Sequence, residues 1–115
     1  MTTTSLDAKL TTRMRIIKKS ALRAFVQRHP NAQAAIEAWI QTVTHAEWKN
    51  LADTRQTYRH ADQVTLINGS SITVFNLCGN DFRLLVSIHY GTQIVFIRDF
   101  LTHADYSKNR WKNEH

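Results

Sequence analysis

The sequence VFNLCGNDFR occupies residues 74–83, and VFIRDFLTHADY follows it at residues 95–106. Both stretches are typical of strands, because β-branched and aromatic residues dominate them and glycine-containing breaks separate them. Each carries an arginine among apolar residues, Arg83 in the first and Arg98 in the second. A guanidinium cannot shed its charge, so it is costly to bury without an anion or a carboxylate as partner. We therefore expect these arginines to have such a partner.

Turn signals divide the surrounding sequence into four strand patterns. The patterns cover residues 64–67, 72–77, 82–90 and 93–100. Asn68-Gly69, between the first two, is a strong hairpin signal because both residue types tolerate positive φ. The spacing predicts four consecutive antiparallel strands.

Alternation with period two assigns side chains to the faces of this sheet. In the third strand, Arg83 and His89 lie opposite an apolar set, which is Phe82, Leu84, Val86, Ile88 and Tyr90. In the fourth strand, one face carries Ile94, Phe96, Arg98 and Phe100, and the other carries Val95, Ile97 and Asp99. We expect two helices to cover one face and a partly open, arginine-bearing cleft to form on the other.

The residues before the sheet predict one strand and two helices. RIIKK at residues 15–19 is a short strand pattern, and Ser20 suits the N-cap of a helix that Pro30 must end. Asn31 suits the cap of a second helix. Its apolar stripe has helical period and consists of Ala32, Ala35, Ile36, Trp39, Ile40 and Val43. Residues 44–61 predict a basic loop with one helical turn.

The two ends of the chain complete an α+β fold class. Residues 1–13 are polar and aperiodic, so they predict a flexible extension before a domain that spans residues 14–115. Thr102 suits the N-cap of a short C-terminal helix. The predicted fold is an N-terminal strand and two helices packed on a four- to five-stranded, mainly antiparallel sheet, followed by that short helix.

Composition limits the class of protein. The 115 residues suffice for one globular domain, with 43% hydrophobic residues, a single cysteine and a net charge of +6. One cysteine forms no internal disulfide, and no apolar run is long enough to span a bilayer or serve as a signal peptide. We therefore expect a cytoplasmic protein without membrane contact. The positive charge favours phosphate polymers or acidic partners.

Motifs for several enzyme classes are missing from the sequence. It has no P-loop, GxGxxG, HExxH, CxxC or GxSxG pattern, which argues against nucleotide-dependent, zinc-dependent and serine-hydrolase activity. Its six histidines are scattered rather than clustered with carboxylates at metal-ligand spacing. We predict no metal site and no cofactor.

The remaining candidates are cationic and proton-transferring side chains. Arg83 suits a phosphate clamp, and a structural ion pair with Asp81 or Asp99 is the alternative. His103 and Tyr106 are three residues apart, so on a helical turn both could reach one ligand. The alternative is that His103 begins the helix and Tyr106 packs on the sheet edge. A basic face, which could bind RNA, is formed by Lys49, Arg55 and Arg59.

Several segments together resemble the HigB family of type II toxins in the RelE-like superfamily. The resemblance runs from about Met14 to Tyr106, and its two separate motifs, FN-x-x-GN-x-x-R ending at Arg83 and THADY at residues 102–106, occur at the family's spacing. Cys78 departs from the small residue that the family often has there, and residues 1–13 precede the usual start. The resemblance implies a compact RelE-like α+β fold.

The resemblance also implies an activity and partners. The family's members are endoribonucleases, or mRNA interferases, which often act on mRNA in the ribosome and are held inactive by a helix-turn-helix antitoxin of the HigA type. By motif, Arg83, His103 and Tyr106 are the expected catalytic positions and Arg98 a further substrate-binding one. Lys49, Arg55 and Arg59 would extend the RNA footprint.

These residue types permit cleavage without a metal. His103 would take the proton of the ribose 2′-OH, Arg83 would stabilise the charge on the phosphate, and Tyr106 would orient the phosphate or assist the leaving 5′-oxygen. Two other classes stay open at this point. One is a non-catalytic RNA- or ribosome-binding module, and the other is a protein-interaction domain whose basic cleft receives an acidic partner.

Overall fold

The computed structural model describes residues 14–109 and 111–114, and the predicted extension at residues 1–13 lies outside this part of the chain. The elements, in chain order, are β1 (Arg15–Ile17), α2 (Lys19–Arg28), the 3₁₀ turn η1 (Pro30–Ala32), α3 (Gln33–Thr44), α4 (Leu51–Thr57), β2 (Asp62–Thr65), β3 (Ser71–Leu77), β4 (Phe82–His89), β5 (Ile94–Thr102), α5 (His103–Ser107) and α6 (Trp111–Glu114). No helix among these residues is both long and apolar enough to cross a membrane.

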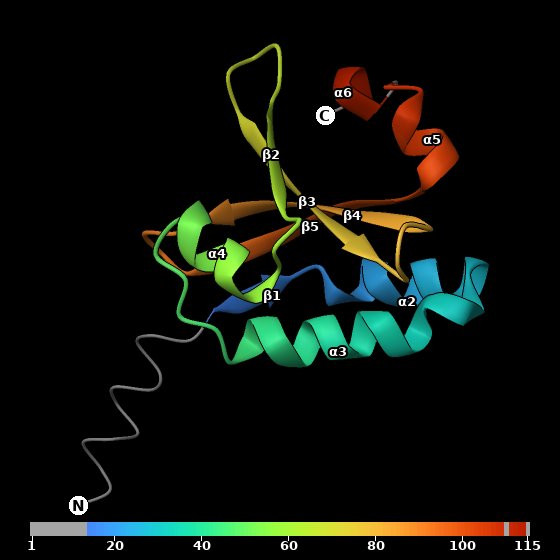
Figure 1. Ribbon diagram of the computed structural model, residues 1–115, viewed down its shortest axis with the longest axis horizontal. Coiled ribbons are helices and arrows are strands. Elements are labelled where there is room, and N and C mark those ends of the chain that lie inside the picture. Colours follow the sequence, from blue (N-terminus) through green and yellow to red (C-terminus); the bar gives the residue numbers. More distant parts are fainter. Residues whose placement is uncertain (1–13, 110, 115) are drawn as a thin grey trace, which may run out of the picture.

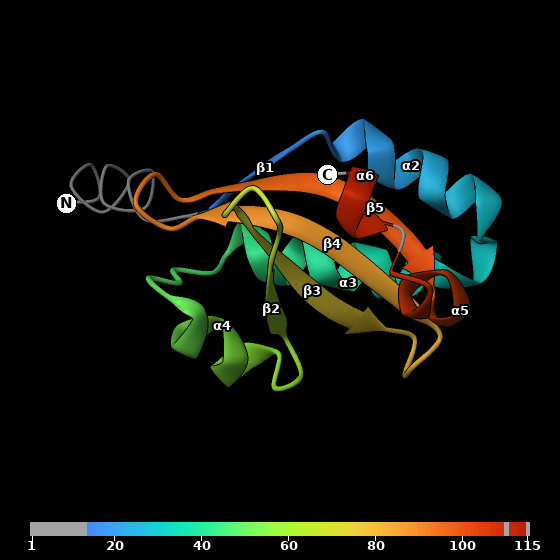
Figure 2. The same ribbon diagram turned by 90° about the horizontal axis from the view of Figure 1, so that it is seen from above.

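The strands form one five-stranded sheet in the order β1-β5-β4-β3-β2. β1 pairs with β5 in parallel, whereas the three pairings among β2, β3, β4 and β5 are antiparallel. Helices α2 and α3 lie along one face of the sheet, and α5 and α6 lie on the other side with the projecting β2–β3 hairpin (Figures 1 and 2). The predicted α+β fold and mainly antiparallel sheet are confirmed.

The main core lies between α2, α3 and the sheet. Its fully buried members alternate along β4, as predicted, and meet the apolar stripes of both helices. They include Leu22, Phe25, Ile36, Trp39, Val43, Phe75, Phe82, Leu84, Val86, Val95, Ile97 and Phe100. Trp39 packs edge-on against Phe75, with ring centroids 5.6 Å apart. Burial of this apolar surface holds the helices to the sheet.

A second, smaller core lies on the opposite face. Its buried members are Leu66, Ile72, Val74, Leu85 and Trp111. Arg83 and Leu85 therefore point away from the helices, as the alternation in β4 predicts. The β2–β3 hairpin and the C-terminal segment cover part of this face, so only the remainder is open.

The predicted alternation in β5 is wrong beyond Ile97. The pairing register shifts at this point, so that Val86 faces Ile97 but Leu85 faces Asp99. The extra residue of this irregularity, Arg98, is exposed. Because one inserted residue reverses the faces of all that follow, Phe100 joins Val95 and Ile97 in the main core. The simple period-two pattern could not reveal this bulge.

Three element boundaries also differ from the prediction. α2 begins at Lys19 and its N-cap is Lys18, in the left-handed region at φ 71°, so Ser20 is not the cap. Asn31 lies within η1 rather than capping α3. The predicted basic loop holds a full helix, α4, whose N-cap Asn50 accepts a hydrogen bond from the Asp53 amide. Side-chain caps are thus present at α4 but not at the earlier helices.

The strand before the first hairpin turn ends two residues earlier than predicted, at Thr65 instead of Ile67. β2 ends at Thr65, and the buried Leu66 donates its amide to Ser70 O at 2.7 Å across the turn. Gly69 has φ 90°, which other residue types rarely adopt, and this explains the Asn-Gly signal.

Candidate active site

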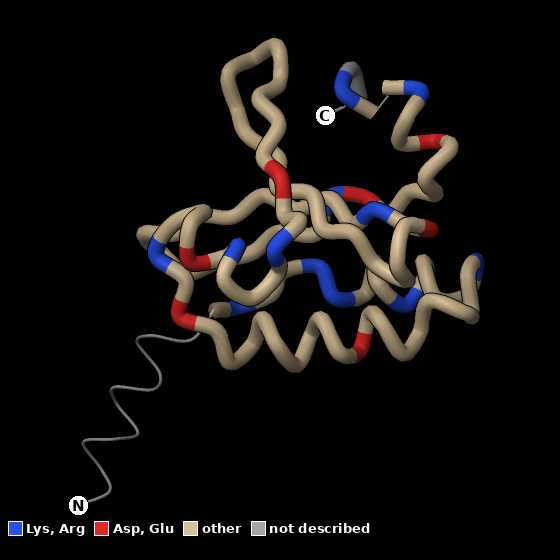
Figure 3. Tube along the Cα trace, in the orientation of Figure 1, with Lys and Arg blue, Asp and Glu red and all other residues tan. Residues whose placement is uncertain are grey.

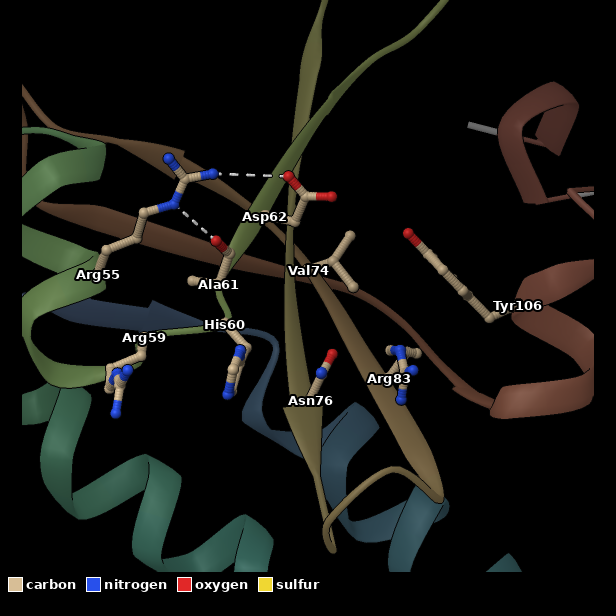
Figure 4. Close-up of a pocket in the computed structure, with 9 residues that line it drawn as sticks. All are labelled: Arg55, Arg59, His60, Ala61, Asp62, Val74, Asn76, Arg83 and Tyr106. Atoms are coloured by element: carbon tan, nitrogen blue, oxygen red, sulfur yellow. Dashed lines mark hydrogen bonds and ion pairs between the residues drawn. The ribbon is translucent and has the colours of Figure 1, made fainter.

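A pocket of about 640 Å³ opens on the sheet face opposite α2 and α3 (Figure 4). α4 and the turn after it supply one wall, β2, β3 and β4 supply the floor, and α5 supplies the other wall. The lining residues are Arg55, Arg59, His60, Ala61, Asp62, Val74, Asn76, Arg83 and Tyr106. The structure thus brings Arg83 and Tyr106 together with Arg55 and Arg59, two members of the predicted basic face.

Arg83 lies at the floor of this pocket and is only 8% exposed. Its guanidinium donates to Asn80 O at 3.1 Å, to Asn80 Oδ1 at 2.8 Å and to Phe82 O at 3.2 Å. Among the residues that the structure describes, it forms no ion pair with Asp81 or Asp99. Neutral acceptors therefore orient this cation without neutralising it, and it can attract an anion in the pocket.

Tyr106 lies beside Arg83 and is the fourth residue of the short helix α5. The Arg83 Cζ lies 5.6 Å from the centre of the phenol ring, in cation–π geometry. Partial burial raises the pKa of Tyr106 above 10.0, the charge of Asp62 raises it further, and Arg83 opposes both. At neutral pH the phenol therefore keeps its proton and can donate it in a hydrogen bond.

Arg55 in α4 and Asp62 at the start of β2 interact on the α4 side of the pocket. Arg55 Nε donates to Ala61 O at 2.8 Å, and its terminal nitrogen lies 3.6 Å from Asp62 Oδ1. Both side chains are largely exposed, so this ion pair contributes little to stability and serves mainly to fix the arginine at the rim. With three arginines and one aspartate among the lining residues, the pocket is net positive.

Two histidines differ in their relation to the pocket. His60 lies in the turn after α4 and lines it (Figure 4). His103 is the first residue of α5, is exposed, and is not among the lining residues. Its amide donates to Asp81 O at 2.9 Å, and its Nδ1 lies 3.2 Å from Ser107 Oγ. His103 thus helps to join α5 to the β3–β4 turn.

Residues 32–109 match the family described as HigB_toxin, the RelE-like toxic component of a toxin-antitoxin system. The chain belongs to the HigB toxin family. It is 23% identical over 93 residues to the mRNA interferase toxin HigB of Escherichia coli (strain K12). The aligned residues cover 81% of this chain and 88% of that protein. The mRNA interferases HigB of Escherichia coli O157:H7 and Shigella flexneri match to the same extent.

The HigB match covers every lining residue of the pocket. A second hollow of about 340 Å³ shares Arg59, His60, Ala61 and Asn76 with it. This hollow extends toward Tyr58 and Gly79. The two hollows therefore adjoin at these four residues.

Two predicted substrate-binding residues lie away from the pocket of the HigB chain. Lys49 is exposed ahead of α4, where its amide donates to Asp53 Oδ2 at 2.9 Å. Arg98 is exposed at the irregularity of β5. Neither is among the lining residues. Blue positions for Lys and Arg are spread over the trace in Figure 3, so positive charge alone does not locate the site.

Three polar lining residues, His60, Asp62 and Asn76, are not among the site residues predicted from the sequence. Asn76 pairs with Arg83 across β3 and β4, and this register could have identified it. His60 and Asp62 follow a helix that was predicted as a loop, so no pattern placed them at the sheet. The described residues of this HigB chain contain no group of three or more His, Cys, Asp or Glu that could hold a metal ion.

Proposed function

We propose that this toxin-family chain is an mRNA interferase, an endoribonuclease that cuts mRNA and so stops translation. The observation that supports this best is the pocket that gathers Arg83, Tyr106 and two further arginines on the open sheet face. Cations and a protonated phenol suit a phosphodiester. The relatives named mRNA interferase give the same indication for the substrate.

The proposed reaction uses the ribose 2′-OH as nucleophile and needs no metal. A base removes its proton, the oxygen attacks the adjacent phosphorus, and the bond to the 5′-oxygen of the next nucleotide breaks. Arg83 stabilises the added negative charge on the phosphate oxygens, and Tyr106 donates a hydrogen bond to the phosphate or to the departing oxygen. The departing 5′-oxygen takes a proton from Tyr106 or from water, so the products are a 2′,3′-cyclic phosphate and a 5′-hydroxyl end.

Two histidines are candidates for the base. The sequence motif nominates His103, whereas the pocket contains His60. Because a general base must come within hydrogen-bond reach of the proton that it takes, the geometry favours His60. His103 keeps a role in this proposal as the residue that joins α5, and hence Tyr106, to Asp81 O.

The two adjoining hollows suggest a path for the RNA. We propose that the scissile phosphate sits at Arg83 and Tyr106 and that a neighbouring nucleotide enters the second hollow beside Tyr58 and Gly79. Arg55 and Arg59 would then contact the backbone on one side. Lys49 and Arg98, which lie farther out, would add only long-range attraction for RNA or for the ribosome.

Membership of a toxin-antitoxin family implies an antitoxin partner. We propose a helix-turn-helix antitoxin of the HigA type that covers the basic pocket with an acidic segment, in the cytoplasm where mRNA and ribosomes are found. Blocking entry to the ribosome from the far side is the competing arrangement. Titrating the complex with a non-cleavable RNA analogue separates them: binding as tight as that of the free toxin would show that the pocket is not covered.

Expression of the chain alone tests the function. We expect growth arrest and mRNA cleavage, and we expect Arg83→Ala to relieve both while circular dichroism shows a retained fold. A non-catalytic binding module would stop translation without new RNA ends. A protein-interaction domain would leave RNA and translation unaffected, so either result would overturn the proposal.

A further inference from the structure

Trp111 lies beyond the segment that matches the toxin family, yet it packs on the pocket side of the sheet. The match ends at residue 109, and Trp111 begins the short helix α6. It is 2% exposed and belongs to the second core with Leu66, Ile72, Val74 and Leu85. The chain after α5 therefore folds back onto the face that carries the pocket.

Trp111 contacts Tyr106 in two ways. The two rings are stacked, with centroids 5.2 Å apart and planes 13° from parallel. The indole Nε1 also donates to the Tyr106 carbonyl oxygen at 3.0 Å. The stack fixes the plane of the phenol ring, and the hydrogen bond fixes the backbone that carries it.

The Tyr106 ring also contacts Arg83. The parallel indole stacks on the phenol, and the Arg83 Cζ lies 5.6 Å from the centre of the same ring. Arg83 is in turn fixed by Asn80 and Phe82. Without the indole, the ring stack and the hydrogen bond would both be lost, which would favour rotation of the Tyr106 side chain to another staggered rotamer, away from Arg83.

We propose that Trp111 is a positioning residue of the nuclease site, which holds the Tyr106 ring against Arg83 and keeps the phenol hydroxyl in the pocket. This inference rests on the proposed function. It makes the C-terminal segment, outside the family match, part of the site. Because Trp111 acts through Tyr106, its removal and the removal of Tyr106 should not have independent effects.

A double-mutant cycle tests the proposal by single-turnover cleavage of a short RNA. We expect Trp111→Leu to slow cleavage by about 10- to 100-fold, the range for a misplaced reacting group. The double variant Trp111→Leu/Tyr106→Ala should be no slower than Tyr106→Ala alone, within about threefold. Effects that multiply in the double variant would overturn the proposal.

Two further variants separate positioning from stability. Trp39→Leu removes a buried indole from the main core, on the other face of the sheet, and should lower the melting temperature but leave the cleavage rate of the folded protein unchanged. Trp111→Phe keeps a stacking ring and should retain most of the rate. The proposal fails if Trp39→Leu slows the folded protein as much as Trp111→Leu, or if Trp111→Phe is as slow as Trp111→Leu.

A binding measurement distinguishes failure of this inference from failure of the proposed function. An RNA with a 2′-deoxy residue at the scissile position lacks the nucleophile, so its binding can be measured without cleavage. Fluorescence anisotropy gives its Kd for the wild type, Trp111→Leu, Tyr106→Ala and the double variant. If the wild type binds this RNA but does not cleave ordinary RNA, the nuclease proposal fails. The positioning role of Trp111 is then judged from Kd: coupled effects of Trp111 and Tyr106 support it, and independent effects overturn it. A wild type that neither cleaves nor binds overturns both.

Discussion

Arg83 is buried, and among the described residues no carboxylate forms an ion pair with it. Its three hydrogen bonds go to two carbonyl oxygens and an amide oxygen, so its full charge remains available to a ligand. The sequence could identify it, because one arginine interrupts an apolar strand. The sequence could not choose between a phosphate clamp and an ion pair, because that choice depends on which groups the register and turns bring near the guanidinium.

Replacement of Arg83 should affect activity far more than replacement of an exposed arginine. We expect Arg83→Ala to slow RNA cleavage by about 100-fold or more, because it removes a charge aimed at the phosphate. Arg23→Ala, an exposed change on α2 at the other face, is the control and should leave the rate unchanged. Single-turnover assays measure both, and equal effects would show that only general charge matters.

The two histidines should differ in the same assay. We expect His60→Ala to lower the cleavage rate by about 100-fold, because it removes the proposed general base. His103→Ala should have a smaller effect on the rate, because His103 does not line the pocket. The reverse ranking would assign the base to His103, as the sequence motif alone predicts.

His60 also shows why part of the site was not predictable. It follows α4, whose seven residues carry little apolar periodicity, so the segment was predicted as a loop. α4 is held instead by its Asn50 cap and by the buried Thr54, whose Oγ1 lies 2.9 Å from the Tyr90 hydroxyl. The first contact is a helix cap and the second joins residues far apart in the sequence. A hydrophobic pattern predicts neither kind of contact.

Element α5 carries Tyr106, and a single cap defines where it begins. Thr102 Oγ1 accepts a hydrogen bond from the Asp105 amide at 3.1 Å, as the sequence predicts. The last strand feeds directly into this helix, so the cap sets the direction in which Tyr106 leaves the sheet. The bulge at Arg98, in contrast, could not be predicted, because an inserted residue leaves strand composition unchanged.

Loss of the Thr102 cap should weaken both stability and activity. We expect Thr102→Ala to lower the free energy of unfolding by about 1 kcal/mol, the typical cost of losing an N-cap. Because Tyr106 belongs to this helix, a frayed first turn would misplace the phenol, and the cleavage rate should fall as well. Thr92→Ala is the control, since that hydroxyl makes only a 3.5 Å contact in an exposed turn. Urea titration and cleavage assays measure both, and indistinguishable variants would contradict the role of the cap.

At the scale of the whole molecule, the ionisation of three partly buried tyrosines makes the free energy of unfolding depend on pH. Burial raises the pKa of Tyr58, Tyr90 and Tyr106 above 10.0. Below that value both folded and unfolded chains are protonated, and the stability from these groups is intact. As the pH rises further the unfolded chain ionises first, so stability is lost as the pH passes through the folded pKa.

The free energy of unfolding should therefore fall as the pH rises above about 10. Tyr90→Phe cannot ionise at that position and should show a smaller fall over the same interval, even if it is less stable at neutral pH. Urea titrations at several pH values measure this. A fall of the same size in Tyr90→Phe would mean that Tyr90 has no part in the alkaline transition.

The overall topology was the most predictable feature, because helical stripes, strand alternation and glycine turns all agree on one α+β arrangement. The pocket was less predictable. It combines α4, three strands and α5, and its shape depends on the hairpin and on the C-terminal Trp111 that together cover the rest of the face. Such long-range packing has no local sequence signal.

The central claim is that this pocket cuts RNA through the 2′-OH without a metal. The most direct measurement compares an RNA with the same RNA carrying a single 2′-deoxy residue at the cleavage position, both in EDTA. We expect the first to be cut to a cyclic phosphate and a 5′-hydroxyl end, with Arg83→Ala inactive, and the second to stay intact. Cleavage of the deoxy-substituted RNA, or cleavage that EDTA abolishes and a divalent metal restores, would contradict the account.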